Sequence, residues 1–425
     1  MMQIELPYGK GKLTVQIPDE RIQTVIHSRL DSFQPGKDEY EIVREAMQNP
    51  IGTKSLRELA RGKQKVVIIA SDHTRPVPSK IIMPLMLSEI RAGNPQADIT
   101  ILIATGCHRG TTREELAAKF GDEIIEREKI VVHDCADESM MREIAVLPSG
   151  GKLIVNKMAL EADLLVAEGF IEPHFFAGFS GGRKSVLPGI ASRQTVHANH
   201  CSAFIADPHA RTGILEGNPI HRDMIFAAKE AKLAFIVNVV INSKQQVIGA
   251  FAGDCDKAHL AGANFVGDLC RAPACPADIV ITTNNGYPLD QNAYQAVKGM
   301  TAAEATCNQG GVIIMVAKCE DGIGGDSFYK TFAENPSAEK LMEQFLAIPQ
   351  DETIVDQWQS QIFARVLMKC KVVFVSSLDP QTVRGLHMTP AASIEEALQK
   401  ADQLLGRSGA KITVIPEGIS NIIRE

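Results

Sequence analysis

Runs of valine and isoleucine alternate along this chain with segments of helical periodicity, and this alternation is its strongest structural constraint. The sequence predicts strands at 65–72, 98–106 and 162–170, with helices at 79–93 and 112–121 after the first two. Such an alternation is typical of βα units around a parallel sheet. A hairpin is expected to close this half of the chain, at residues 232–254.

The pattern restarts after the proline-rich stretch 270–278, with strands and helices expected at 279–290, 291–306, 310–318, 356–370, 371–378 and 393–406. A chain of 425 residues exceeds what one hydrophobic core usually organises. We therefore expect an α/β protein of two domains, each with a mostly parallel sheet flanked by helices. The domains are expected at 1–270 and 276–410, and the last strand, within 411–425, fits either.

Charge and composition narrow the function classes. The net charge of −7 and the absence of any basic run leave no positively charged surface that would attract nucleic acid. No nucleic-acid partner is therefore expected. Residues 1–16 alternate charged and apolar positions, which excludes a signal peptide and a membrane span and predicts a cytoplasmic protein. Nine cysteines without a CxxC pair indicate reduced thiols rather than a zinc ribbon.

Charged side chains gather where the predicted strands end, which is where open α/β sheets bind ligands. Such positions include Asp72 and Arg75 after the first strand, His108 after the second and His174 after the third. Both histidines suit acid–base chemistry near neutral pH, although most histidines are surface or core residues. Arg75 precedes a proline, so its guanidinium could reach a carboxylate or phosphate, or form an ordinary ion pair with Asp72.

A glycine-rich loop at 172–189, EPHFFAGFSGGRKSVLPG, carries an arginine and a lysine together. Glycine-rich turns often cradle phosphate, but Gly178 stands six residues ahead of Lys184, and Arg183 occupies the place of the second glycine of a P-loop. No dinucleotide fingerprint opens a helix here either. From spacing alone the loop is either an anion site or a surface turn with two cations.

Three further groups each have two interpretations. His197 and His200 are three apart on an expected helix and either share a metal or coincide by chance. Gln295 and Lys298 have the same spacing and form either a binding surface or a solvated polar face. Trp358, the only tryptophan, is more often a core residue than a ligand wall.

Six separated motifs together resemble the nickel-pincer lactate racemase family: SDHTRPVPS, GCHRGTTREEL, HFFAGFSGGRKSVLPGIAS, HANH, NGYPLDQNAYQAVKGMTAAEAT and DQWQSQIFAR. The resemblance implies an isomerase that interconverts D- and L-lactate by hydride transfer through a pyruvate intermediate. It also implies a nickel-pincer nucleotide, pyridinium-3-thioamide-5-thiocarboxylic acid mononucleotide, attached covalently to Lys184. His200 would bind the nickel, and His197 would not.

The same resemblance implies roles for the remaining positions, in an active site between the two domains. His108 and His174 match the catalytic acid–base pair. The other matching residues are Asp72, Arg75, Ser180 and Gly181 at the cofactor, and Arg75, Tyr294, Gln295, Lys298 and Trp358 at the substrate. Residues 1–270 would hold the cofactor, and 276–410 would close the cleft.

The implied partners are a small 2-hydroxy acid and the enzymes that mature the cofactor. One alternative is a racemase or epimerase of another small 2-hydroxy acid with the same cofactor. A non-enzymatic cofactor-binding protein is a further alternative, which the His108 and His174 pair disfavours.

Overall fold

A computed structural model describes residues 1–424, which fall into two compact units. The central unit comprises residues 30–200 and 207–269, and the terminal unit comprises 1–29, 201–206 and 270–424. This division differs from the expected one, because residues 1–29 and 201–206 pack with the C-terminal half. The reason is β-pairing and one buried contact: Ile22 joins the sheet of the terminal unit beside Ile412, and the Gln361 amide donates to the Ser202 carbonyl.

The central unit contains a six-stranded sheet with five parallel strands and one antiparallel edge strand. The predicted hairpin at 232–254 is confirmed as its antiparallel pair. In sheet order the strands are β13 (Val247–Gly253), β12 (Leu233–Ile241), β9 (Leu164–Phe170), β4 (Lys65–Ser71), β5 (Asp98–Ala104) and β6 (Lys129–Val132).

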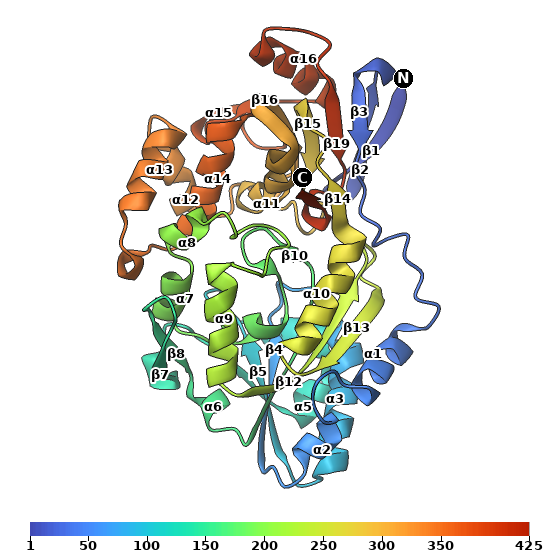
Figure 1. Ribbon diagram of the computed structural model, residues 1–425, viewed down its shortest axis with the longest axis vertical. Coiled ribbons are helices and arrows are strands. Elements are labelled where there is room, and N and C mark those ends of the chain that lie inside the picture. Colours follow the sequence, from blue (N-terminus) through green and yellow to red (C-terminus); the bar gives the residue numbers. More distant parts are fainter. Residues whose placement is uncertain (425) are drawn as a thin grey trace. The chain divides into compact units, whose positions relative to one another are not determined.

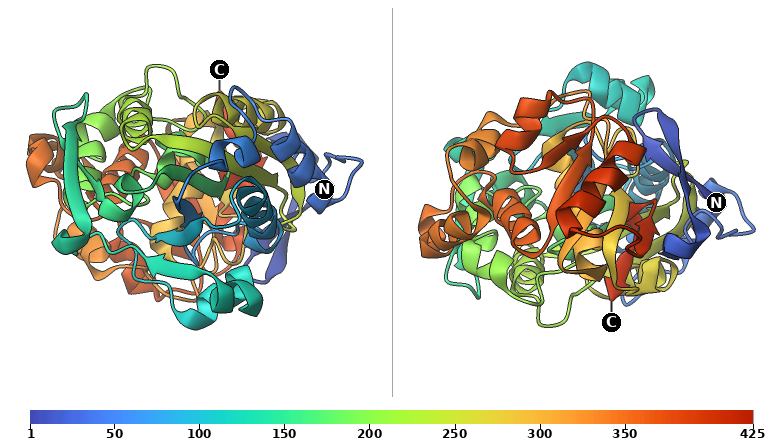
Figure 2. Two further views of the ribbon diagram at one scale, coloured as in Figure 1. Left: turned by 90° about the horizontal axis from the view of Figure 1, so that it is seen from below. Right: turned by 90° about the horizontal axis from the view of Figure 1, so that it is seen from above.

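Helices cover both faces of this sheet, as its almost entirely apolar strands require. One face packs on α1 (Glu39–Gln48), α2 (Leu56–Ala60), α3 (Ser79–Gly93), α4 (Arg113–Phe120) and α5 (Asp122–Arg127). Figure 1 shows α9 (Pro219–Glu230) and α10 (Lys257–Cys270) on the other face, which Figure 2 shows from two further directions. Shorter elements complete the unit: η2 (Glu138–Met140), β7 (Met141–Val146), β8 (Lys152–Asn156), α6 (Lys157–Leu160), β10 (Pro173–His174), β11 (Gly178–Phe179), η3 (Gly182–Ser185) and α7 (Arg193–Asn199).

The terminal unit is built on a second six-stranded sheet, and all of its strands are parallel. The strand predicted near 411 belongs to this sheet, next to the strand from the N-terminal segment. In sheet order the strands are β18 (Thr389–Ala391), β17 (Lys371–Val375), β16 (Cys307–Val316), β15 (Ala277–Thr283), β19 (Ile412–Ile415) and β3 (Ile22–Val25).

One face of this second sheet packs on a hairpin of β1 (Met2–Tyr8) and β2 (Gly11–Ile17) together with α16 (Ile394–Leu405). The other face packs on α11 (Ala293–Thr306) and α14 (Gln357–Lys369). The remaining elements are η1 (Asp19–Arg21), α8 (Ser202–Ala206), β14 (Arg271–Pro273), α12 (Asp326–Ala333), α13 (Ala338–Ala347), η4 (Gln350–Glu352), α15 (Pro380–Gly385), η5 (Gly418–Ser420) and β20 (Ile422–Arg424). Across the described residues, every helix is too short or too polar to traverse a lipid bilayer.

Candidate active site

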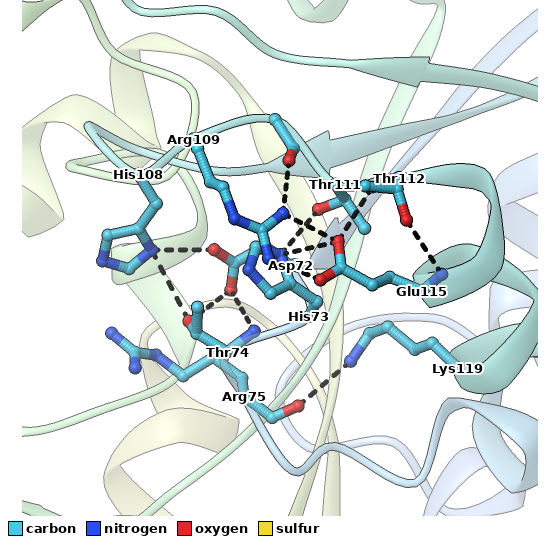
Figure 3. Close-up of polar contacts among 11 residues, drawn as sticks. Asp72, His73, Thr74, Arg75, His108, Arg109, Thr111, Thr112, Glu115 and Lys119 are labelled. Carbon is cyan, nitrogen blue, oxygen red and sulfur yellow. Dashed lines mark hydrogen bonds and ion pairs between the residues drawn. The ribbon is translucent and has the colours of Figure 1, made fainter. Parts of the chain in front are cut away.

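Asp72 and His108 meet at the carboxyl end of the central sheet (Figure 3). Asp72 directly follows β4 and His108 follows β5, and these two strands are parallel neighbours. The Asp72 Oδ2 atom lies 2.7 Å from Nδ1 of His108, and the Thr74 hydroxyl donates to Oδ1 of Asp72 over 2.7 Å. The sequence left open an ion pair between Asp72 and Arg75, but the carboxylate binds the imidazole instead.

The surroundings of Asp72 keep its carboxyl ionised. Burial opposes ionisation, but the hydrogen bond and charge of His108 outweigh it, with help from Thr74 and Arg75, and lower the pKa of Asp72 to about 2. Only 2% of the Asp72 side chain is exposed, whereas 46% of the His108 side chain is exposed. The pair therefore joins a fixed buried anion to an imidazole that solvent and small molecules can reach.

Arg75 lies in the same loop, and its side chain is solvent-exposed. The Lys119 ammonium fixes its backbone by donating a hydrogen bond to the Arg75 carbonyl over 3.2 Å. Figure 3 shows the Arg75 guanidinium and the His108 ring on the same side of this cluster. Within the described part of the chain, no acceptor is bonded to that guanidinium, so it is available to an anionic ligand.

The other charged residues at these strand ends serve the local structure. Glu115 caps α4 by accepting from the Thr112 amide over 2.9 Å. The same carboxylate accepts two bonds from the Arg109 guanidinium, at 2.6 and 2.9 Å, and lies 3.6 Å from Nδ1 of His73. His73 also lies 3.2 Å from the Thr111 hydroxyl. Arg109 and His73 thus anchor the loop beside the Asp72–His108 pair.

Arg183 is the cation that the glycine-rich loop buries, with no exposed side chain surface. Its guanidinium donates to the Ala177 carbonyl over 2.7 Å, and it lies 3.1 Å from Nδ1 of His221 and 2.8 Å from Nε2 of His259. Desolvation lowers the pKa of Arg183 to about 9. Arg183 therefore holds the loop together through buried hydrogen bonds, and its guanidinium does not face a ligand.

The glycines of this loop are required because the neighbouring chain leaves no room for larger side chains. Gly181 has φ +73, and a Cβ there would lie 2.7 Å from both the Asn238 side chain oxygen and the Phe170 carbonyl. The Gly182 amide donates to that same Asn238 oxygen over 2.6 Å. Ser180 fixes the start of the turn, because its hydroxyl donates to the Phe170 carbonyl over 3.0 Å.

Phe176 lies beside three of the predicted site residues, one catalytic and two at the cofactor. Its ring lies 4.5 Å from the His174 ring and 5.1 Å from the His200 ring, centroid to centroid. The Lys184 Nζ atom lies 5.6 Å from the Phe176 centroid and 3.1 Å from Nε2 of His174. The Ala177 amide donates to Nδ1 of His174 over 3.3 Å, which fixes the ring in place. The predicted tether, metal ligand and acid–base histidine therefore share one aromatic neighbour.

His200 is buried, and its uncharged imidazole has a ring nitrogen whose lone pair suits a metal ion. It follows the last residue of α7, and its Nδ1 lies 3.0 Å from the Val196 carbonyl, which places the proton on Nδ1 and the lone pair on Nε2. Burial, followed by the charge of Lys184, lowers the pKa of His200 to about 3. The described residues contain no cluster of three or more metal-binding side chains.

Four further predicted residues lie in the terminal unit. Tyr294 and Trp358 stand on α11 and α14, and their side chains are hydrogen-bonded. The Tyr294 hydroxyl donates to Asp356 over 2.8 Å, and burial followed by the Asp356 charge raises the pKa of Tyr294 well above its ordinary value. Gln295 and Lys298 lie on the same helix, both partly exposed.

Comparison with known proteins decides the family. The model of the lactate racemase N-terminal domain matches residues 8–213, and that of the C-terminal domain matches residues 272–423. Curated lactate racemases from Thermoanaerobacterium thermosaccharolyticum and Lactiplantibacillus plantarum are 57% and 52% identical to this chain, each over the full length of both proteins. The chain belongs to the lactate racemase family. As a member of that family it is an isomerase, specifically a racemase.

Solved structures agree with this lactate racemase assignment at the level of fold. The apoprotein of the lactate racemase from Thermoanaerobacterium thermosaccharolyticum superposes over all of both chains with a TM-score of 0.97. A protein from Thermotoga maritima, 17% identical, matches 91% of this chain and 99% of its own with a TM-score of 0.66, which shows the fold alone. The predicted α/β class, with two mostly parallel sheets flanked by helices, is confirmed.

Sequence reasoning missed several residues that shape the site of this lactate racemase family member. Thr74 binds Asp72, Asn238 binds the loop at Gly182, and His259 binds Arg183. Thr74 was within reach of a sequence argument, since it lies two residues after Asp72 in a predicted loop. Asn238 lies in β12, 56 residues after Gly182, and His259 lies in α10, 76 residues after Arg183, so no local signal points to them.

Proposed function

We propose that this protein interconverts D- and L-lactate, using a nickel-pincer nucleotide attached to Lys184. The observation that carries this proposal is the full-length similarity to two curated lactate racemases, at 57% and 52% identity. When bound, the nucleotide would supply hydride chemistry at C2 of the substrate, with Lys184 as its tether and His200 as its nickel ligand. We further propose that dedicated maturation enzymes supply this group.

The residues in the central unit fit such a cofactor. A lysine tether and an imidazole ligand of one cofactor must lie near one another. Lys184 and His200 both contact the Phe176 ring. Imidazole nitrogen suits nickel, and the low pKa of His200 keeps its donor atom unprotonated at neutral pH. Ser180 and Gly181 hold the loop that carries Lys184 and are the proposed backbone contacts of the nucleotide.

His108 and His174 are proposed to move the hydroxyl proton of the substrate. One histidine serves each enantiomer: it takes the hydroxyl proton when that enantiomer is oxidised and gives a proton back when that enantiomer re-forms, so the reaction runs in both directions. Asp72 holds Nδ1 of His108 over 2.7 Å, which leaves Nε2 to face the substrate and stabilises the imidazolium once it forms. The contact between His174 and Lys184 supports a role for the second histidine beside the proposed tether.

Substrate orientation is the proposed task of the remaining residues. Arg75 offers a planar fork that matches the lactate carboxylate, which must be held while the ketone turns. Gln295 and Lys298 are proposed to provide further polar contacts to the substrate. The bulky side chains of Tyr294 and Trp358 are proposed to limit the substrate pocket to a small acid. The location of this site between the two domains stays a prediction.

Isotope retention tests the hydride mechanism. Cofactor-loaded protein is given L-lactate with deuterium at C2 in ordinary water, and the D-lactate formed is analysed by mass spectrometry. We expect most of the label to remain, because a hydrogen moved as hydride does not mix with water. Proton exchange by His108 and His174 alone would remove the label, and that result would refute hydride transfer but not racemisation.

A further inference from the structure

Two cysteines lie beside the Asp72–His108 pair without a part in the proposed reaction. Cys107 immediately precedes His108 in the loop after β5 and is exposed. Cys135 follows the neighbouring strand β6 and is 8% exposed. The Cys107 side chain lies close enough to Cys135 to lower the pKa of the Cys135 thiol.

The backbone holds these two loops together. The Thr105 hydroxyl donates to the His133 carbonyl over 2.6 Å, and the His133 amide donates to the Ile103 carbonyl over 3.0 Å. Each cysteine follows one of the joined residues by two positions, Cys107 after Thr105 and Cys135 after His133. The closeness of the thiols is therefore a consequence of strand pairing rather than of chance side chain orientation.

The residues around Cys135 also favour the thiolate form of its side chain, which is the reactive form. The hydrogen bond from Cys107 lowers the pKa of Cys135; burial and Asp134 oppose this effect, while the hydrogen bond and charge of Arg193 support it. Arg193 is held against the same loop, since its amide donates to the Cys135 carbonyl over 3.2 Å. Thiolates stabilised by a cation are the cysteines that react first, and a small oxidant would reach the largely buried Cys135 past the exposed Cys107.

We propose that Cys107 and Cys135 form a reversible disulfide on exposure to hydrogen peroxide, and that this bond displaces His108. The Cys135 thiolate attacks one peroxide oxygen, the O–O bond breaks, and the departing hydroxide takes a proton to become water. The Cys107 sulfur then attacks the resulting sulfenic acid, the S–O bond breaks, and the second hydroxide leaves as water with the Cys107 proton. Two thiols are oxidised by two electrons, and one peroxide is reduced.

Displacement of His108 follows from the difference in length between the two kinds of contact. Sulfur atoms in a disulfide lie about 2.0 Å apart, much closer than two hydrogen-bonded thiols. The tight turn in which the His108 amide donates to the Thr105 carbonyl over 3.0 Å must therefore shift. The contact of His108 with Asp72 spans only 2.7 Å, and such a bond tolerates little movement. The consequence for activity rests on the proposed function, whereas formation of the disulfide does not.

Peptide mapping of the full-length protein tests the bond itself. Reduced protein is treated with hydrogen peroxide, alkylated and digested, alongside the variants Cys107→Ser and Cys307→Ser. Cys307 is the matched control, because it also contacts a second cysteine, Cys370, in the terminal unit. We expect wild type and Cys307→Ser to lose two hydrogen atoms and link Cys107 to Cys135, with the link reversed by dithiothreitol. Failure to link these two residues, or a link only between Cys307 and Cys370, would overturn the proposal.

Two readouts test the displacement of His108. Diethylpyrocarbonate labelling of His108, measured on the protein without any activity assay, is expected to change at least fivefold after oxidation of wild type and to stay constant in Cys107→Ser. In cofactor-loaded protein, peroxide is expected to lower wild-type racemisation at least tenfold more than that of Cys107→Ser. Equal labelling, or equal loss of activity in both proteins, would refute the displacement while the mapped disulfide stood.

Discussion

Replacement of Asp72 by asparagine removes one charge from the site and keeps the shape of the side chain. The pKa of Asp72 is about 2, compared with an ordinary 3.8. At about 1.4 kcal/mol per pKa unit, this difference corresponds to about 2.5 kcal/mol in favour of the ionised carboxylate. His108 and its hydrogen bond provide most of that stabilisation, and the same hydrogen bond holds the imidazole in position for the substrate proton.

Loss of this stabilisation predicts a fall in kcat of roughly 10- to 100-fold, with a smaller change in KM. Chiral chromatography of the lactate formed by cofactor-loaded Asp72→Asn measures both constants. Asp163→Asn is the matched control, because Asp163 also accepts hydrogen bonds, from the Gln64 and Lys65 amides, but lies near the opposite end of β4. A kcat within threefold of wild type in Asp72→Asn would refute the role assigned to this carboxylate.

Acid stability gives a second measure of the same charge. Because the folded-state pKa of Asp72 lies below its ordinary value, its contribution to stability is complete above pH 4 and is lost as the pH falls towards 2. Urea unfolding at pH 6 and pH 3 should therefore show a weaker pH dependence in Asp72→Asn than in wild type. Parallel slopes in the two proteins would show that the carboxylate is not stabilised as the structure indicates.

Four further substitutions separate the tether, the metal ligand and the support of the loop. Lys184→Ala should abolish racemisation and leave no covalent adduct in an intact-mass measurement; an adduct on another lysine would contradict the tether. His200→Ala should lower nickel retention in a metal assay, whereas His197→Ala should leave it nearly unchanged, and the reverse order would show that the ligand was misassigned. Arg183→Met should lower the free energy of unfolding by about 3 kcal/mol or more, because it leaves buried carbonyls without a donor, and a loss below 1 kcal/mol in urea melts would refute that structural role.

The sequence predicted those parts of the fold that local pattern determines. Strands β4, β5 and β9 and helices α11, α14 and α16 lie within two residues of their expected limits, because apolar runs and helical periodicity are properties of neighbouring residues. The placement of residues 1–29 differs from the expected division. Strand β3 has only four residues, and its partner lies near the other end of the chain, so no local propensity points to the pairing.

The site shows the same limit. Asp72, Arg75, His108 and His174 could be grouped from sequence because parallel strands place their carboxyl ends at one edge of a sheet. Which carboxylate meets which cation is decided by side chain geometry, so the bond from Asp72 to His108 rather than to Arg75 needed the structure. Burial of Arg183 likewise depends on distant partners, and its sequence neighbours gave it the appearance of a ligand-binding cation.

The position of β3 at the edge of the second sheet has a consequence for synthesis of the protein. Ile22 pairs with Ile412, so about 390 residues separate partners in one sheet. At roughly 5–20 residues per second, a ribosome needs roughly 20–80 s to make that intervening segment. The central unit is complete before β19 emerges and is free to fold first, while the N-terminal hairpin and β3 wait with apolar residues exposed. During this lag the apolar side chains of the first 29 residues have none of their partners from the second sheet.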